Sequence, residues 1–340
     1  MSFCINILKK IWHCLRFVCV TSPVSYSPSD DGPSRPVKRT NSSSWMINIV
    51  RTIRFKHDAL KDHGYWYLKS SEWSTQFPDS NGTKQSPINL VSKTAIYDPK
   101  LREKLLSISY TSSRETDFLN NGQTVVIYPK SRNDTSVRQE QAVRSVITGG
   151  PLADDEYELA EIRFHWGRCS GRGSEHTVNG KAFPMELQFI HWNSTLYQNL
   201  EEATGKENGI AAICLFVQIG RENPAFRALI ADSLDDILYK GRQKTTYAPF
   251  NPASLLPVSE LLQDYWVYDG SLTHPPCSEN VTWILLRYPL LLSQEQAMDF
   301  RRLNTYSQET KVTNAYEGKL VDNFRPIQPL NGRKIRASFQ

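Results

Sequence analysis

The chain has 340 residues, of which 39% are hydrophobic and 11% aromatic, so it can form one large domain or two ordinary ones. Its formal charge is +5, but residues 1–63 hold ten Lys and Arg against four Asp and Glu, whereas the remainder holds thirty against thirty-one. A near-neutral main domain argues against a nucleic-acid-binding face. Charged or histidine residues interrupt every apolar run before the roughly 18 residues that a membrane span needs.

Residues 1–62 form a basic extension that we expect to be largely disordered, and residues 63–340 form the main domain. Residues 1–20 mix apolar residues, cysteines and a few basic side chains. They leave open a signal peptide or a basic membrane-surface helix, but a poorly ordered tail is the simplest interpretation. Residues 21–44 are rich in Ser and Pro, which is typical of a disordered linker.

The main domain is predicted to be α+β and mainly β, because β-branched and aromatic runs are bounded by Gly, Pro or Asn. The expected strands are 124–129, 161–166, 185–192, 210–220 and 281–289. Two segments have helical spacing, 223–239 and 293–303, and the second begins with Ser293 and Gln296 in a capping-box pattern. Strands without regular intervening helices indicate a large, mostly antiparallel sheet.

The six cysteines indicate a reduced environment. They are widely spaced and form no CxxC pair, so neither a disulfide framework nor a cysteine zinc site is predicted. Their positions are Cys4, Cys14, Cys19, Cys169, Cys214 and Cys277. We therefore expect a cytoplasmic protein.

Several motifs of the main domain resemble the α-carbonic anhydrases in order and spacing. They are "QSPINL" (85–90), "FHWG" (164–167), "GSEHTVNGKAFPMEL" (173–187), "IHWN" (190–193), "GSLTHPPCSENVTWIL" (270–285) and "DNFRPIQPL" (322–330). Others, such as "RFHWGR" and "DYWVYDGSLT", most resemble the non-catalytic subgroup called carbonic anhydrase-related protein VIII. The resemblance implies one domain around a twisted, mainly antiparallel ten-stranded sheet with a conical cleft on one side.

The resemblance also implies where a catalytic zinc ion would lie. A catalytic zinc takes three protein ligands and keeps one position open for water. An H-x-H pair on one strand and a third histidine on the next strand supply these ligands in the family, because residues two apart share a strand face. The matching positions here are Arg163, His165 and Gln188, of which only one is histidine. Arg163 has no lone pair and stays protonated, so we expect no zinc and no other cofactor.

The remaining histidines are not expected to supply the missing zinc ligands. From Gly64 onward the others are His176, His191 and His274. His191 lies three residues after Gln188 and should face the other side of the strand, while His274 should lie near the cleft on a loop. His176 resembles a structural histidine of the family. His165 itself then reads as an ordinary hydrogen-bonded core residue.

The other cleft positions are partly retained. Glu175 and Thr273 match the pair that orients the zinc-bound hydroxide in active relatives, although a buried Glu–Thr hydrogen bond would also hold the loop without a metal. Gln123 stands at the usual proton-shuttle position, and an amide does not titrate near neutral pH. Glu161 lies two residues before Arg163, so we expect Arg163 to pair with Glu161 or Glu175.

These residues predict a catalytically inactive protein that works by binding another protein. The resemblance implies a cytosolic partner, the inositol 1,4,5-trisphosphate receptor, and we expect a monomer. One departure is that the subgroup has an acidic N-terminal segment, whereas the extension here is basic. The alternative is a residual zinc-dependent carbonate dehydratase or a metal-free esterase that uses the cleft.

Overall fold

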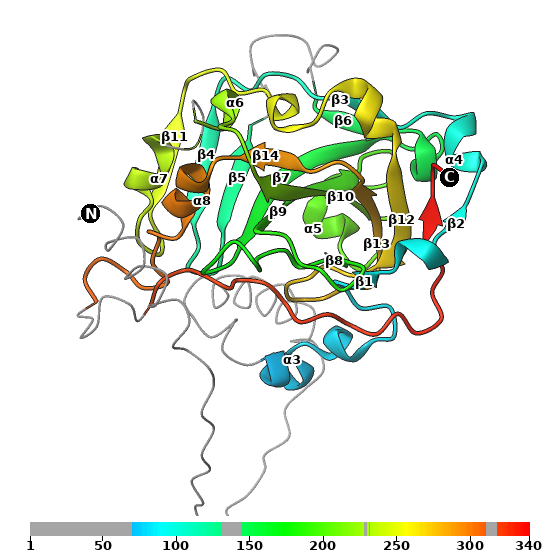
Figure 1. Cartoon of the computed structure of the whole chain (residues 1–340), viewed down its shortest axis with the longest axis horizontal. Helices are drawn as coiled ribbons and strands as arrows, with labels where there is room; N and C mark the ends of the chain where they lie inside the picture. The colour runs from blue at the N-terminus through cyan, green and yellow to red at the C-terminus, as the bar shows by residue number, and fades with distance from the viewer. Residues whose placement is uncertain (1–69, 131–143, 228–229, 231, 311–317) are drawn as a thin grey trace, which may run out of the picture. The chain divides into compact units, whose positions relative to one another are not determined.

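The computed structural model describes residues 70–130, 144–227, 230, 232–310 and 318–340 (Figure 1). The predicted extension 1–62, its boundary with the main domain and the possible membrane segment 1–20 all lie outside these residues. Within them, no helix is long and apolar enough to cross a membrane.

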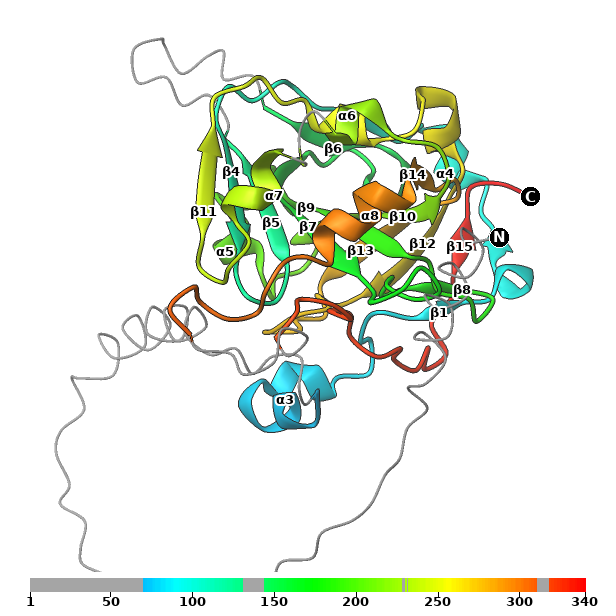
Figure 2. The ribbon, with the colours of Figure 1, turned by 60° about the vertical axis from the view of Figure 1, so that its left-hand side comes forward.

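The described chain is built around one large mixed sheet, which agrees with the predicted class. Its longest path joins ten strands in the order β11-β4-β5-β7-β9-β10-β13-β12-β15-β2, and β14, β3 and β6 branch from it (Figures 1 and 2). The strands are β2 (Ile96–Tyr97), β3 (Ser107–Ser109), β4 (Thr116–Asn120), β5 (Val125–Pro129), β6 (Val146–Thr148), β7 (Tyr157–Trp166), β9 (Met185–Asn193), β10 (Ile210–Ile219), β11 (Gln243–Thr246), β12 (Tyr265–Gly270), β13 (Val281–Leu286), β14 (Leu290–Leu292) and β15 (Arg336–Ala337). A second, two-stranded parallel sheet joins β1 (Asn89–Leu90) to β8 (Thr177–Val178).

Most neighbours in the large sheet are antiparallel, as the sequence predicts. The parallel pairs are β10 with β13, β10 with β14, and β15 with β2. All five predicted strands are present, as β5, β7, β9, β10 and β13, with ends shifted by up to four residues. A register shift between Leu159 and Glu161 interrupts the pairing of β7 with β9.

Helices are few and short in the part of the chain that the structure describes. The α-helices are α3 (Ser70–Gln76), α4 (Lys100–Glu103), α5 (Leu200–Ala203), α6 (Pro224–Phe226), α7 (Asp232–Asp236) and α8 (Gln294–Phe300). The 3₁₀ turns are η1 (Pro78–Asn81), η2 (Ser92–Thr94), η4 (Gly150–Leu152), η6 (Pro252–Leu255) and η7 (Ser259–Gln263). Helix α8 has the predicted capping box, in which the Ser293 hydroxyl accepts from the Gln296 backbone amide. The helix expected over 223–239 is present as α6 and α7, with Arg227 and Ile230 between them in π-helical conformation, and it ends at Asp236.

The two faces of the sheet bury separate apolar clusters. On β7 and β9, alternate residues such as Phe164, Leu187 and Phe189 join a large cluster that helices α6 and α8 complete with Phe226 and Phe300. The opposite face contributes to a smaller cluster with Cys214, Tyr268 and Trp283. The polar residues predicted for the site lie on this second face, because they alternate with the first set along each strand.

Candidate functional site

The pairing of β7 with β9 brings the first predicted ligand positions together. Arg163 lies directly opposite Gln188, and His165 lies directly opposite Glu186. Because neighbouring strands are about 4.8 Å apart, side chains on the shared face of such pairs are within contact range. The strand periodicity in the sequence therefore located three of the expected side chains correctly relative to one another.

Arg163 forms the ion pair that the sequence predicts. Its Nε donates to Glu161 Oε1 at 2.5 Å, and the two side chains are only 14% and 7% exposed. Burial and the neighbouring Glu161 carboxylate together raise the pKa of Tyr128 to about 12, so this phenol stays neutral beside the pair. A guanidinium and its carboxylate thus stand where the resemblance places the first metal ligand.

His165 has a defined orientation although the residue two positions before it on the strand is Arg163 and not a second histidine. Its Nδ1 donates to the backbone oxygen of Asn323 at 2.7 Å, and the side chain is 2% exposed. With the proton on Nδ1, Nε2 carries the lone pair, and this buried atom has no hydrogen-bond partner among the described residues. The residue is hydrogen-bonded as predicted, but only on one of its two nitrogens.

Gln188 is held by two carboxylates. Its Nε2 donates to Glu175 Oε2 at 2.8 Å and to Glu186 Oε1 at 2.9 Å. The amide oxygen must then face the other way, where it accepts from the Thr273 hydroxyl at 3.5 Å. The hydrogen bond expected between Glu175 and Thr273 is therefore not made, because the amide of Gln188 lies between the two residues and binds both.

His274 adds a second imidazole near Arg163. Its Nδ1 donates to the backbone oxygen of Pro275 at 2.9 Å, and its Nε2 is buried without a partner among the described residues. Burial, together with the positive charge of Arg163, holds the pKa of His274 well below its usual value, so the ring is neutral at pH 7. We call Glu161, Arg163, His165 and His274 the Arg163 cluster.

A second set of polar residues lies beside this cluster on the same sheet face. His176 Nδ1 donates to Glu186 Oε1 at 2.9 Å, and the His176 backbone amide donates to Glu186 Oε2 at 2.8 Å. His176 Nε2 is 2.6 Å from the Tyr268 hydroxyl, which is 2.7 Å from Ser86 Oγ. We call Ser86, His176, Glu186, Gln188 and Tyr268 the Glu186 network.

The Glu186 carboxylate stays ionised in this buried setting. Burial alone would raise its pKa, but the His176 charge and hydrogen bond outweigh burial and lower the pKa to about 2. Cys214 lies close enough that ligand atoms of His176, Glu186 and Cys214 are all within 4.8 Å of one another. Both His176 nitrogens already have hydrogen-bond partners and burial raises the pKa of the Cys214 thiol, so these three residues are better described as a packed network than as a metal site.

Two predicted positions lie apart from both groups. His191 faces the opposite side of β9, as expected, where its Nδ1 donates to Ala211 O at 3.2 Å and its ring lies 2.7 Å from the Tyr110 hydroxyl. Gln123 is connected to the site through its backbone, because its carbonyl oxygen accepts from Asn323 Nδ2 at 2.9 Å. Within the described part of the chain, the Gln123 side chain forms no hydrogen bond to the Arg163 cluster.

Sequence reasoning missed two residues that hold the site together. Asn323 accepts from His165 through its backbone and from the Trp166 amide through its side chain, at 2.7 Å each. Arg325 donates its backbone amide to Glu175 Oε1 at 2.8 Å and its guanidinium to Gln85 Oε1 at 2.8 Å. Both lie in "DNFRPIQPL", a motif that carried the resemblance, but no strand periodicity connects that segment to β7.

Comparison with known proteins now identifies the family. Residues 68–339 match the model described as eukaryotic-type carbonic anhydrase. The chain belongs to the carbonic anhydrase family. It is 54% identical to the human "Carbonic anhydrase-related protein" over 265 aligned residues. The alignment covers 78% of this chain and 86% of that protein. It is 40% identical to human "Carbonic anhydrase 7" over 281 aligned residues, and this alignment covers 82% of this chain and 98% of that protein.

The zinc ion of active carbonic anhydrases does not fit these residues. Only His165 offers a free imidazole lone pair among the three ligand positions. The Gln188 amide directs its nitrogen to two carboxylates, and the remaining oxygen is a hard, neutral ligand that suits zinc poorly. Arg163 places a fixed positive charge on the same face, and two unit charges 4 Å apart repel by about 4 kcal/mol at an effective dielectric of about 20.

Proposed function

We propose that this carbonic anhydrase family member is catalytically silent and acts by binding another protein. The observation that carries the proposal is the Arg163–Glu161 ion pair at the first ligand position. Activation of water by zinc needs three ligands around one ion, and an ion pair between two side chains supplies none of them. The family fold is intact around this position, so the surface of the domain remains available for function.

The relatives support a binding role without specifying the partner. Two proteins named "Carbonic anhydrase-related protein" match at 54% identity, whereas carbonic anhydrases 1, 5A, 5B and 7 match at 38–41%. We further propose a cytoplasmic, monomeric protein whose partner is the inositol 1,4,5-trisphosphate receptor, on the resemblance to the non-catalytic subgroup. No nucleic acid is proposed, because the charge of the main domain is close to zero.

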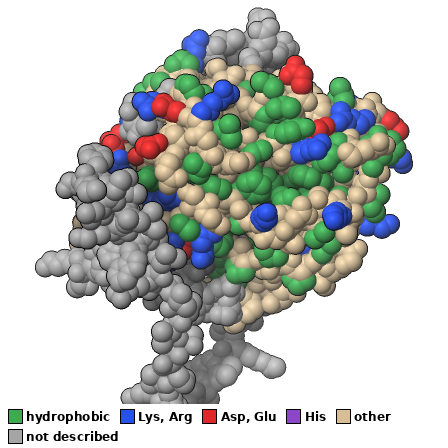
Figure 3. Space-filling model, viewed as in Figure 1, with side chains coloured by type: hydrophobic (Ala, Val, Ile, Leu, Met, Phe, Trp, Pro, Cys, Tyr) green, Lys and Arg blue, Asp and Glu red, His purple; other side chains and the backbone are tan. Residues whose placement is uncertain are grey.

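The exposed surface is consistent with protein contacts. On the face drawn in Figure 3, apolar side chains gather toward the middle with Lys and Arg scattered among them, and most acidic side chains lie nearer the rim. Several large apolar side chains are well exposed, including Tyr247 at 74% and Val258 at 65%. Exposed aromatic side chains such as Tyr247 are enriched where proteins associate.

Zinc content and carbon dioxide hydration, measured together on the purified full chain, test the catalytic part of the proposal. We expect less than a tenth of an equivalent of zinc per chain, as an order of magnitude, after dialysis against micromolar zinc, and hydration at the uncatalysed rate. Stoichiometric zinc with sulfonamide-sensitive turnover would show that the chain is an enzyme.

A second candidate function is a residual zinc-dependent carbonate dehydratase or a metal-free esterase. The observation that favours it is the pair of unpartnered nitrogens, Nε2 of His165 and Nε2 of His274, on the face where active relatives hold their metal. Hydrolysis of 4-nitrophenyl acetate by the zinc-free chain distinguishes the metal-free esterase from the zinc-dependent dehydratase. Loss of that hydrolysis in the His274→Gln variant would support the esterase, and no hydrolysis above a heat-denatured control would exclude it.

The named partner needs a separate measurement. We expect the full-length chain to bind the purified ligand-binding region of the inositol 1,4,5-trisphosphate receptor in a pull-down and to weaken binding of inositol 1,4,5-trisphosphate to it. Retention of the receptor region by empty resin to the same extent would refute this partner.

A further inference from the structure

Five Asn-Gly pairs occur in the chain, and at each of them an asparagine side chain can react with its own backbone. The pairs are Asn81–Gly82, Asn121–Gly122, Asn179–Gly180, Asn208–Gly209 and Asn331–Gly332. The reaction uses the backbone nitrogen of the residue after asparagine, and glycine favours it because glycine has no Cβ atom to hinder the approach. The folded structure then decides which of the five glycine nitrogens is available.

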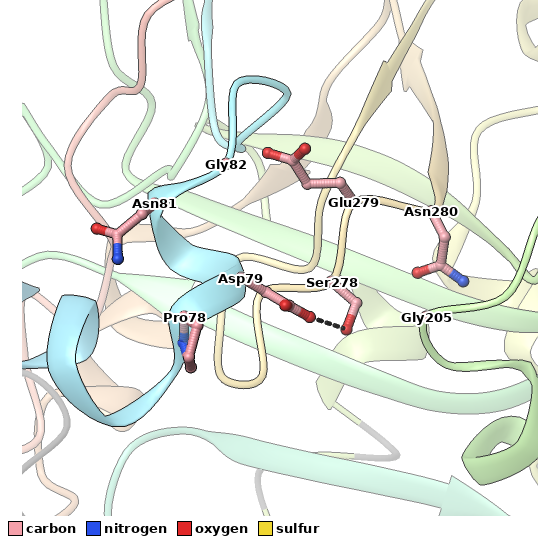
Figure 4. A pocket seen from close by; sticks show the side chains of 8 residues that line it. All are labelled: Pro78, Asp79, Asn81, Gly82, Gly205, Ser278, Glu279 and Asn280. Atoms are coloured by element: carbon pink, nitrogen blue, oxygen red, sulfur yellow. Dashed lines mark hydrogen bonds between the residues drawn. The ribbon is translucent and has the colours of Figure 1, made fainter.

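Two of the pairs are held by turns and enclosed by neighbouring groups. The Gly82 amide donates to Asp79 O at 3.0 Å, and the Gly209 amide donates to Lys206 O at 3.1 Å. A Cβ atom at Gly82 would lie 2.0 Å from Glu279 Oε1, and Figure 4 shows this carboxylate close to Gly82. A Cβ atom at Gly209 would lie 2.0 Å from a backbone oxygen. Both glycines are therefore bound and have little room to move.

Two further pairs have their glycine amides bound to asparagine side chains. The Gly122 amide donates to Asn120 Oδ1 and the Gly180 amide donates to Asn89 Oδ1, at 2.8 Å each. Gly122 is also buried, and a Cβ atom there would lie 2.7 Å from the Lys240 side chain. Gly180 is exposed and has open space around it, so its hydrogen bond is the main feature that protects this pair.

The Asn331–Gly332 pair differs from the other four. It lies at the centre of a tight turn in which the Arg333 amide donates to Leu330 O at 3.0 Å. Asn331 and Gly332 have φ values of 50° and 74°, and positive values at both central positions are typical of a type I′ turn. Both residues are exposed, and the Gly332 amide donates no hydrogen bond within the described structure. A Cβ atom at Gly332 would have no heavy atom within 4 Å, so the peptide also has room to turn.

We propose that Asn331 is a deamidation site of the folded chain. The Gly332 backbone nitrogen forms a bond to Cγ of Asn331, the bond from Cγ to Nδ2 breaks, and Nδ2 leaves as ammonia with the proton of the Gly332 amide. Water then opens the cyclic imide at one of its two carbonyl carbons, which gives aspartate or isoaspartate. The reaction needs only water besides the groups of the chain itself.

The products would weaken one contact between the C-terminal segment and the segment before β1. Asn331 Nδ2 donates to Thr83 O at 2.9 Å, and deamidation replaces this donor with a carboxylate oxygen, so two acceptors would face each other. The isoaspartate form also adds a methylene group to the backbone of the turn. Arg333 would still hold the turn, because its guanidinium donates to Asp269 O and Gln85 O. We therefore expect a local loosening with one added negative charge and no global unfolding.

Ageing of the purified full chain at neutral pH and body temperature, followed by peptide mass spectrometry, tests the site. We expect the peptide that contains Asn331 to deamidate at least roughly tenfold faster than the peptides of the other four pairs, because those pairs must first break a hydrogen bond or open locally. Transfer of a labelled methyl group from S-adenosylmethionine by an isoaspartate methyltransferase identifies the isoaspartate form of the same peptide.

The same chain unfolded in guanidinium chloride is the control for sequence effects. Each pair there has the same following residue and no fixed hydrogen bond, so we expect the five rates to lie within roughly threefold of one another. An equal lead of Asn331 in the unfolded chain, or a rate at Asn331 in the folded chain no higher than at the other pairs, would overturn the proposal.

Asn89→Ala tests whether the hydrogen bond to the glycine amide is what protects a pair. The variant removes the acceptor of the Gly180 amide, so deamidation at Asn179 should rise at least roughly threefold while the rate at Asn331 stays unchanged. Asn331→Gln is the matched control, because glutamine would have to form a larger ring and its peptide should show no deamidation over the same period. An unchanged rate at Asn179 in Asn89→Ala would refute selection by the free glycine amide.

Discussion

The Glu186 network and the Arg163 cluster lie side by side on one face of β7 and β9, yet they differ in how completely their polar groups are paired. In the network, Glu186 accepts from His176 through both oxygens, and the His176 ring is bonded at both nitrogens. In the cluster, His165 and His274 each leave a buried Nε2 without a partner in the described structure. The network thus has the pairing expected of a structural core, and the cluster does not.

The difference separates bonds between protein groups from positions whose buried polar atoms have no partner in the described structure. The Glu186 network stabilises the sheet and its loops through bonds between protein groups, and it is complete without zinc. His165 retains the orientation of a metal ligand, because its Nδ1 donates to a backbone carbonyl, as ligating histidines commonly do. At the two other positions where the resemblance places ligands, the chain has Arg163 and Gln188, and the supporting bonds around them are in place.

The largest effect is expected when the two missing ligands are restored together. Arg163→His with Gln188→His removes the fixed positive charge and adds two imidazoles, so we expect zinc affinity to rise on the order of 10⁴-fold, or about 5.5 kcal/mol. Competition with a chromogenic chelator measures this, and either single variant is the control with a much smaller gain. No gain in the double variant would mean that the supporting bonds, and not only the ligands, have changed.

Removing the centre of the Glu186 network is expected to be the most damaging single change. Glu186→Ala would leave His176 without its carboxylate partner in a fully buried site, so we expect the free energy of unfolding to fall by about 3–5 kcal/mol. Urea unfolding followed by tryptophan fluorescence measures it, with exposed Glu156→Gln as a control within about 0.5 kcal/mol. A loss below about 1 kcal/mol would show that the network is not a main source of stability.

Acid should destabilise the folded chain in a defined pH window. Burial lowers the pKa of His191 to about 3, against 6.5 for the free side chain, so the unfolded chain binds a proton there that the folded chain does not. Stability from this residue is then complete above about pH 6.5 and falls by about 1.4 kcal/mol per pH unit as the pH drops toward 3. Glu186, with its pKa lowered to about 2, contributes a further loss below about pH 4.5.

The His191 contribution is separable by substitution. The His191→Gln variant should be less stable than the parent at pH 7. Between pH 6.5 and 4.5, however, its free energy of unfolding should fall by about 2–3 kcal/mol less than that of the parent. Equilibrium urea unfolding at five pH values measures the slope. Parallel slopes for the variant and the parent would contradict a buried neutral His191.

The smallest effect is expected at the ion pair of the Arg163 cluster. Glu161→Gln removes the carboxylate but leaves a polar partner, and Arg163 is 14% exposed, so we expect a loss of only about 1–2 kcal/mol. A double-mutant cycle with Arg163→Met isolates the pair, whose coupling should exceed about 0.5 kcal/mol. Additive losses in the cycle would show that Arg163 is stabilised by other groups.

The sequence predicted those parts of the site that strand periodicity governs. Residues two apart on β7 and on β9 share a face, which placed Arg163, His165 and Gln188 together and His191 on the opposite side. It did not predict the Thr273 hydrogen bond to Gln188, because amide orientation depends on all the neighbours of Gln188 at once. The roles of Asn323 and Arg325 depend on segments that are brought together only by the folded chain, so no local pattern reveals them.

The reaction rate of the Cys214 thiol reports how often the structure around the Glu186 network opens. Its thiol is fully buried and burial raises its pKa, whereas Cys169 is exposed. A thiol reagent in excess should therefore modify Cys169 at once, whereas the buried Cys214 and Cys277 react only as fast as the structure opens around each of them. The rate at which the Cys214 peptide alone gains the reagent, followed by mass spectrometry, then reports local unfolding at the Glu186 network.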